Sequence, residues 1–137
     1  MTTAMGSFRT FIGNENGTSN RSGYQLQILG GSKLSFDYAS GSANIAITGG
    51  TDLVSLTWYH GAVTWDGSFL RLYLNGVSDA TAVAQTITAA PGFNWTIGWD
   101  GNHSAGVQGF TPIDDVRVYS TALTSQEVLD IYNAGAQ

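Results

Sequence analysis

The sequence lacks cysteine, and it has few charged residues of either sign. Without cysteine the chain has no disulfides, no thiolate zinc sites and no cysteine nucleophile, although this does not fix its compartment. Only 5 Lys and Arg stand against 10 Asp and Glu, which gives a formal net charge of -5. Because phosphate backbones and anionic lipid surfaces are bound by clustered basic side chains, we expect no nucleic acid partner and no electrostatic membrane anchor.

Long apolar runs are also missing. No stretch is long enough to cross a bilayer, and the N-terminus has no basic start followed by an apolar run, so we expect neither membrane insertion nor a signal peptide. What is present is 42% hydrophobic residues and 18 glycines, which is typical of a globular domain with many strands and tight turns. We expect one domain over residues 1–137, with residues 1–12 as an extended arm or, over 8–12, a short strand.

Short alternating segments between turn residues predict antiparallel strands. Asn75-Gly76 is the strongest hairpin signal, because both residues accept the positive φ of a type I′ turn. Many short strands with a single late helix predict an all-β fold, a sandwich of two antiparallel sheets. The predicted strands cover residues 8–12, 24–29, 33–38, 44–48, 58–65, 69–74, 93–99 and 113–119, with a return strand within 77–87.

One helix is predicted, over residues 124–134. Thr124 and Glu127 have the spacing of a capping box, in which each side chain satisfies a backbone N–H at the helix entrance. Gly135 is placed to end the helix. An apolar stripe along it is supplied by Val128, Leu129, Ile131 and Tyr132.

Two stretches carry a family resemblance. IDDVRVYSTALTSQEVLDIYNAG, residues 113–135, resembles the closing segment of the concanavalin A-like lectin/glucanase superfamily in its laminin G-like branch. WYHGAVTWDGSFLRLYLNGV, residues 58–77, resembles the middle signature of that branch. The resemblance implies a jelly-roll β-sandwich with a C-terminal helix. Family members have further strands before the position that matches residue 1. The sheets are therefore expected to be completed by residues 1–12, to be abbreviated, or to be completed by a neighbouring chain.

The carboxylates do not have the pattern of a glycosidase. Glucanases of this superfamily carry their catalytic acids together on one strand, and retaining enzymes need a pair that flanks the glycosidic bond. Here the only glutamates are Glu15 and Glu127, and the adjacent Asp114 and Asp115 point to opposite faces if they lie on a strand. His60 is expected to be a packed structural residue, and no nucleophile motif accompanies it. We therefore expect the protein not to be an enzyme.

The resemblance also implies one candidate metal ligand, Asp114. Members of the superfamily often bind calcium at the rim of the sandwich, through carboxylate and carbonyl oxygens. The alternative is that the Asp114 carboxylate only accepts hydrogen bonds from backbone amides in a tight turn. Asp115 and Arg117 fall on one face of the predicted strand and are expected to pair.

Residues that suit a sugar ligand gather at three places. Sugars stack on aromatic rings, while their hydroxyls need planar polar partners. The alternative is that the tryptophans pack in the core and that Asp66 and Asp100, each before a glycine, only form turns. The candidate ligand-binding residues are Trp99, Asp100, Asn102 and His103 in one loop, Trp65 and Asp66 at a hairpin, and Tyr38 at a third strand end.

Two functions remain open at this point. The first is a non-catalytic binding and adhesion module that recognises a glycan or another surface ligand, displayed on a virion or a bacterial exterior. The second is a structural decoration or assembly protein of a virus particle or other large complex, with no small-molecule ligand and with other protein chains as partners. A binding module should expose aromatic and polar side chains together, whereas an assembly protein should bury on the order of 1,000 Å² or more against a neighbour. The chain as a piece of a larger exported protein is a third expectation.

Overall fold

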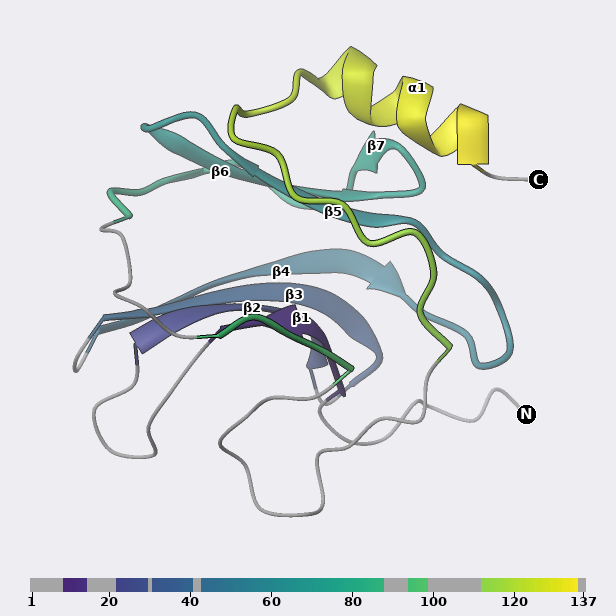
Figure 1. The fold of residues 1–137 in the computed structure, drawn as a ribbon, viewed down its shortest axis with the longest axis horizontal. Coiled ribbons are helices and arrows are strands. Elements are labelled where there is room, and N and C mark those ends of the chain that lie inside the picture. The colour runs from purple at the N-terminus through teal and green to yellow at the C-terminus, as the bar shows by residue number, and fades with distance from the viewer. Residues whose placement is uncertain are drawn as a thin grey trace.

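The computed structural model describes residues 9–14, 22–29, 31–40, 43–87, 94–98 and 112–135. In this part of the chain two antiparallel sheets face each other, and a helix lies on the outer side of one of them (Figure 1). The predicted all-β sandwich is confirmed. None of the described residues forms a helix with the length and apolarity needed to cross a membrane.

The first sheet has five strands in the order β4-β3-β2-β1-β9. Residues of β2, β3 and β4 stand in register, so that Leu26 is opposite Phe36 and Phe36 is opposite Ile47. These apolar side chains share the face that turns towards the second sheet. The strands are β1 Arg9–Gly13, β2 Ser22–Leu29, β3 Lys33–Ser40, β4 Ala43–Asp52 and β9 Thr96–Ile97.

The second sheet is smaller and is built around one hairpin. Its order is β5-β6-β7, and β8 also pairs with β6. The turn after β6 has φ values of 50° at Asn75 and 78° at Gly76, which confirms the predicted turn with two left-handed residues. A Cβ atom at Gly76 would also lie only 2.9 Å from the Leu129 side chain of the helix. The positive φ and this close approach each favour glycine at the position. The strands are β5 Gly61–Trp65, β6 Phe69–Leu74, β7 Val77–Ser78 and β8 Val83–Ala84.

Alternation along β6 divides its side chains between two environments. Leu70 and Leu72 are 0% exposed and pack in the core between the sheets. Phe69, Arg71 and Tyr73 point to the opposite side, where helix α1, Ser125–Gly135, covers the sheet. The predicted capping box is confirmed, because the backbone N–H and hydroxyl of Thr124 both donate to Glu127, which in turn donates its N–H back to the Thr124 hydroxyl.

The polar face of the first sheet is buried as well, although alternation of apolar and polar residues along residues 24–29 is typical of a strand with one face in water. Gln27 donates to the Asp37 carboxylate at 2.5 Å, and the Ser35 hydroxyl donates to the same carboxylate at 3.1 Å. These side chains and Gln25 are all buried. Burial is tolerated there because Gln27, Ser35 and Asp37 satisfy one another's hydrogen-bonding groups.

The strand predicted over residues 113–119 is wrong. Residues 112–119 belong to neither sheet, and Asp115 has a φ of 51° that interrupts the extended backbone. Val118 is 71% exposed, so the alternating pattern does not mark a buried face here. The N-terminal strand is confirmed as β1 over Arg9–Gly13, while the part of the expected arm before residue 9 lies outside the described residues.

Candidate functional site

The turn between β5 and β6 holds a fixed ion pair. One oxygen of the Asp66 carboxylate accepts the backbone N–H groups of Ser68 and Phe69, at 2.9 and 2.7 Å. Its other oxygen accepts Nη1 of Arg71 at 2.6 Å. The hydrogen bond from Phe69, followed by those from Arg71 and Ser68, lowers the pKa of Asp66 to about 2. Asp66 is therefore ionised at neutral pH, with each oxygen already engaged.

The guanidinium of Arg71 is held in place from two sides. It donates to Asp66 and lies over the ring of Phe69, with 5.5 Å between its central carbon and the ring centroid. Such cation–π contacts favour one orientation of the guanidinium. The hydrogen bond to Asp66 also raises the pKa of Arg71, so the side chain stays charged.

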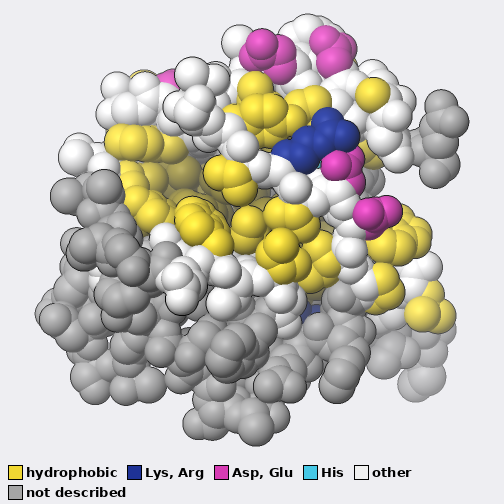
Figure 2. Space-filling view, viewed as in Figure 1, with side chains coloured by type: hydrophobic (Ala, Val, Ile, Leu, Met, Phe, Trp, Pro, Cys, Tyr) yellow, Lys and Arg dark blue, Asp and Glu magenta, His cyan; other side chains and the backbone are white. Residues whose placement is uncertain are grey.

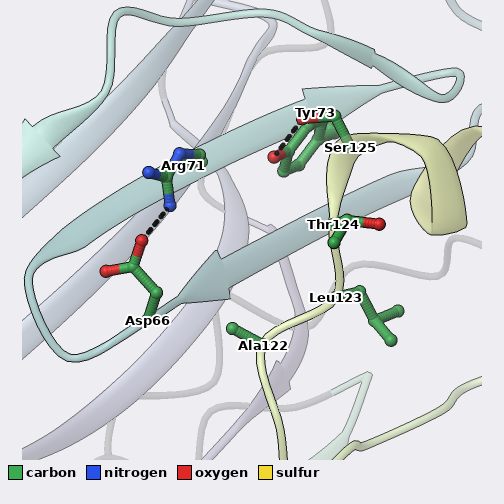
Figure 3. Close-up of a pocket in the computed structure, with 7 residues that line it drawn as sticks. All are labelled: Asp66, Arg71, Tyr73, Ala122, Leu123, Thr124 and Ser125. Carbon is green, nitrogen blue, oxygen red and sulfur yellow. Dashed lines mark hydrogen bonds and ion pairs between the residues drawn. The ribbon is translucent and has the colours of Figure 1, made fainter.

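A hollow of about 340 Å³ opens next to this pair, between the β5–β6 hairpin and the start of α1. Figure 3 shows Asp66 and Arg71 on one side of it and the chain leading into the helix on the other. The Tyr73 hydroxyl, from β6, lies 3.2 Å from the Ser125 hydroxyl, from the helix. We call it the helix-side hollow; it is lined by Asp66, Arg71, Tyr73, Ala122, Leu123, Thr124 and Ser125.

Comparison with known proteins settles the family. A model described as the concanavalin A-like lectin/glucanases superfamily, in its laminin G-like branch, matches residues 1–129. The chain belongs to this superfamily. No curated protein matches it.

One solved structure illustrates the shared fold of this laminin G-like domain. It is the crystal structure of an S-layer domain-containing protein (residues 221–444) from Clostridium thermocellum ATCC 27405, with 22% identity and a TM-score of 0.50. The match covers 96% of the present chain and 65% of that chain, so the laminin G-like domain spans about two thirds of its neighbour's length. At this identity the likeness shows the fold alone.

Three of the predicted ligand residues of this laminin G-like domain are described, and they lie in different surroundings. Asp66 lies in the helix-side hollow. Trp65 stands opposite Leu70, on the face that turns to the other sheet, and its indole N–H donates to the Gln85 carbonyl at 3.0 Å. Tyr38 is 3% exposed and stacks on Tyr24, so the structure places it in the core and not at the surface where the sequence suggested a ligand contact. Trp99, Asp100, Asn102 and His103 lie outside the described residues.

Asp114, the residue that the laminin G-like resemblance marks for calcium, has a local partner. One of its oxygens accepts a hydrogen bond from the backbone N–H of Asp115 at 2.8 Å, while the Asp115 carboxylate forms an ion pair with Arg117. Within the described ranges no three His, Cys, Asp or Glu side chains come close enough to hold a metal. The predicted pairing of Asp115 with Arg117 is confirmed, with contacts of 2.8 and 2.7 Å.

Arg71, which lines the hollow, and Phe69, whose ring lies under its guanidinium, were not predicted from the sequence. The signal was present, since period-two alternation places Phe69, Arg71 and Tyr73 on one face of β6. In the Asp-Gly-Ser-Phe turn the Asp66 carboxylate accepts hydrogen bonds from the backbone N–H groups of Ser68 and Phe69, in the same hairpin. What the sequence did not show is that the start of the helix stands opposite this face.

Proposed function

We propose that this laminin G-like domain is a non-catalytic binding and adhesion module that recognises carbohydrate on a bacterial exterior or a virion surface. Membership of a superfamily of lectins and glucanases supports a sugar ligand. The structural neighbour is named as an S-layer domain-containing protein, which supports an extracellular location. Other protein chains are proposed as further partners.

The observation that carries the proposal is the helix-side hollow. Sugar sites combine an aromatic surface with a few polar groups that are fixed in advance. Arg71, which Asp66 holds in place, lines the hollow together with Tyr73. The exposed ring of Phe69 lies under the guanidinium and is not itself part of the lining. The hydroxyls of Tyr73 and Ser125 add two groups that both donate and accept.

The state of the carboxylates supports binding over hydrolysis. A glycosidase needs a general acid whose pKa is raised, facing a second free carboxylate. In this domain the backbone hydrogen bond from Thr124 lowers the pKa of Glu127, and that of Asp66 is lowered as well. Both side chains are held by local hydrogen bonds that fix a turn or a helix cap.

A glycan array with matched variants tests the proposal. We expect the wild-type domain to bind a subset of glycans and Phe69→Ala to weaken that binding about tenfold, which corresponds to about 1.4 kcal/mol. Phe69 supports Arg71, which lines the hollow. Trp58→Ala is the control, because Trp58 is also exposed but lies outside the β5–β6 hairpin. An array with no bound glycan, or a loss confined to Trp58→Ala, would contradict the proposal.

A second candidate, self-assembly into a structural protein, is favoured by a different observation. Leu56 is fully exposed with a left-handed φ of 63°, a conformation that leucine rarely adopts. Figure 2 shows hydrophobic side chains gathered over the face in view. In the described sheet β5 is an edge strand, and such an edge can pair with another copy of the chain. Exposed large apolar residues include Val54, Leu56 and Trp58, together with Val116, Val118 and Tyr119.

Light scattering in solution separates the two candidates. An assembly protein should give a stable oligomer that dissociates when Leu56 and Trp58 are both changed to serine. Phe69→Ala should leave that oligomer intact, since Phe69 lies on the helix side of its sheet. A monomer at all concentrations would leave carbohydrate binding as the only one of the two candidates that stands.

A further inference from the structure

We infer that the helix-side hollow binds the carboxylate group of an acidic sugar, and that Arg71 is the residue that binds it. The inference rests on the proposed function and deepens it, because it names the ligand's chemical class and the group that selects it. A volume of about 340 Å³ is at the small end of ligand pockets, which suits one sugar ring.

The free hydrogen-bonding groups of the hollow are mainly donors. Arg71 has five N–H groups, and only one of its nitrogens, Nη1, donates to a protein group in the described residues. Asp66 accepts from Ser68 and Phe69 on one oxygen and from Arg71 on the other, so little acceptor capacity is left. A ligand that complements this set must bring acceptors. A carboxylate matches the planar fork of a guanidinium better than a neutral hydroxyl does.

Arg71 differs in this respect from Arg117, which also pairs with an aspartate. Arg117 donates hydrogen bonds from both Nε and Nη2 to the Asp115 carboxylate, at 2.8 and 2.7 Å. One whole edge of its guanidinium is therefore occupied by that pair. Arg117 does not line the hollow. Arg71 donates to Asp66 from a single nitrogen, and its guanidinium lies over the Phe69 ring. Its remaining N–H groups are therefore held in position and can still donate to a ligand. A donor held in position loses less freedom when a ligand binds.

The opposite wall supports the same class of ligand. The Tyr73 and Ser125 hydroxyls share one hydrogen bond, so one of their two hydrogens is left for a sugar oxygen. The positive end of the α1 dipole also lies at this wall and favours an anion. The negative charge of Glu127 stands at the same helix end and reduces this effect, but its carboxylate is bound to Thr124 and does not line the hollow.

Isothermal titration of the whole chain with three probes tests the inference. The probes are sodium glucuronate, glucose as its neutral counterpart, and sodium acetate as a carboxylate without a sugar ring. We expect glucuronate to bind at least tenfold more tightly than either of the others. Arg71→Met should remove the preference over glucose, while Arg117→Met, the matched control, should keep it. Arg71→Lys retains the charge but not the fork, and it should lie between wild type and Arg71→Met.

Each other outcome overturns a stated part of the inference. Equal binding of glucuronate and glucose, or a preference that survives Arg71→Met, would overturn the carboxylate assignment while carbohydrate binding itself still stands. Acetate binding as tightly as glucuronate would overturn the assignment to a sugar. Loss of the preference in Arg117→Met as well would overturn the assignment to this hollow. No binding of any probe at millimolar concentration would overturn the inference, whereas failure of the proposed function would also require an empty glycan array.

Discussion

The β5–β6 hairpin and the segment over residues 112–124 carry similar sequence patterns but differ in structure. Both alternate apolar with polar residues, and both contain an Asp–Arg pair. In the hairpin, Leu70 and Leu72 are completely buried, because β6 lies between β5 and β7 and faces the other sheet. In the segment, Val116 and Val118 are exposed, because the segment pairs with none of the described strands. Alternation predicts a strand only where a partner strand exists.

The largest expected difference between the two regions is in how much one apolar side chain contributes to the free energy of unfolding. Leu72→Ala removes a completely buried side chain and should lower the free energy of unfolding by about 2–5 kcal/mol. Val118→Ala in the exposed segment should change it by no more than about 0.5 kcal/mol. Urea unfolding of both variants measures this contrast. A cost for Val118→Ala close to that for Leu72→Ala would mean that the segment is packed in solution.

A smaller effect is expected where the segment enters the helix. Thr124→Ala removes the hydroxyl that accepts the Glu127 N–H and donates to its carboxylate, and it should cost about 0.5–2 kcal/mol. Thr124→Ser keeps both hydrogen bonds and should stay within a few tenths of a kcal/mol of wild type. Thermal denaturation followed by circular dichroism checks the pair. Equal loss in both variants would show that the threonine methyl group, and not the cap, matters.

The smallest effect is expected from pH, through His60, which lies between the two regions. Burial lowers the pKa of His60 from 6.5, Arg117 lowers it further, and Asp115 opposes both. Its ring lies 6.0 Å from that of Tyr132 on the helix. A histidine with a lowered pKa in the folded state favours folding above pH 6.5. That contribution is lost as the pH falls through the folded-state pKa, so stability should decrease from pH 7 towards pH 5.

His60→Gln should reduce that decrease, and Arg117→Met should reduce it in part by removing the nearby positive charge. Urea midpoints at pH 7, 6 and 5 measure it for each variant. A pH profile that is the same in wild type and His60→Gln would contradict the assignment to His60.

Local patterns predicted the parts of the fold that local chemistry controls. The Asn75-Gly76 turn depends on the φ preference of two residues, and the Thr124–Glu127 cap depends on hydrogen bonds three residues apart. Both were confirmed. The strand predicted over residues 113–119 failed because strand formation depends on a distant partner. Burial of Gln27 and Asp37 was not foreseen for the same kind of reason, since each satisfies the other from a neighbouring strand.

The candidate site was predicted only in part. Asp66 was named, because the Asp-Gly turn and a nearby aromatic residue are visible in the sequence. Trp65 was paired with it, yet Trp65 stands opposite the buried Leu70, while Asp66 lies in the turn that follows β5. Phe69 is the ring beside the ion pair. The hollow itself depends on the helix start, more than fifty residues later, lying against the hairpin. No local pattern contains that contact.

Binding in the helix-side hollow is tested most directly by a two-dimensional amide NMR spectrum of the labelled protein titrated with sodium glucuronate. Signals of Asp66–Tyr73 and Ala122–Ser125 should shift together in the wild type, and Arg71→Met should abolish the shifts. Shifts confined to residues 99–103 would place the ligand in the loop that the sequence first suggested. They would contradict the assignment of binding to the helix-side hollow.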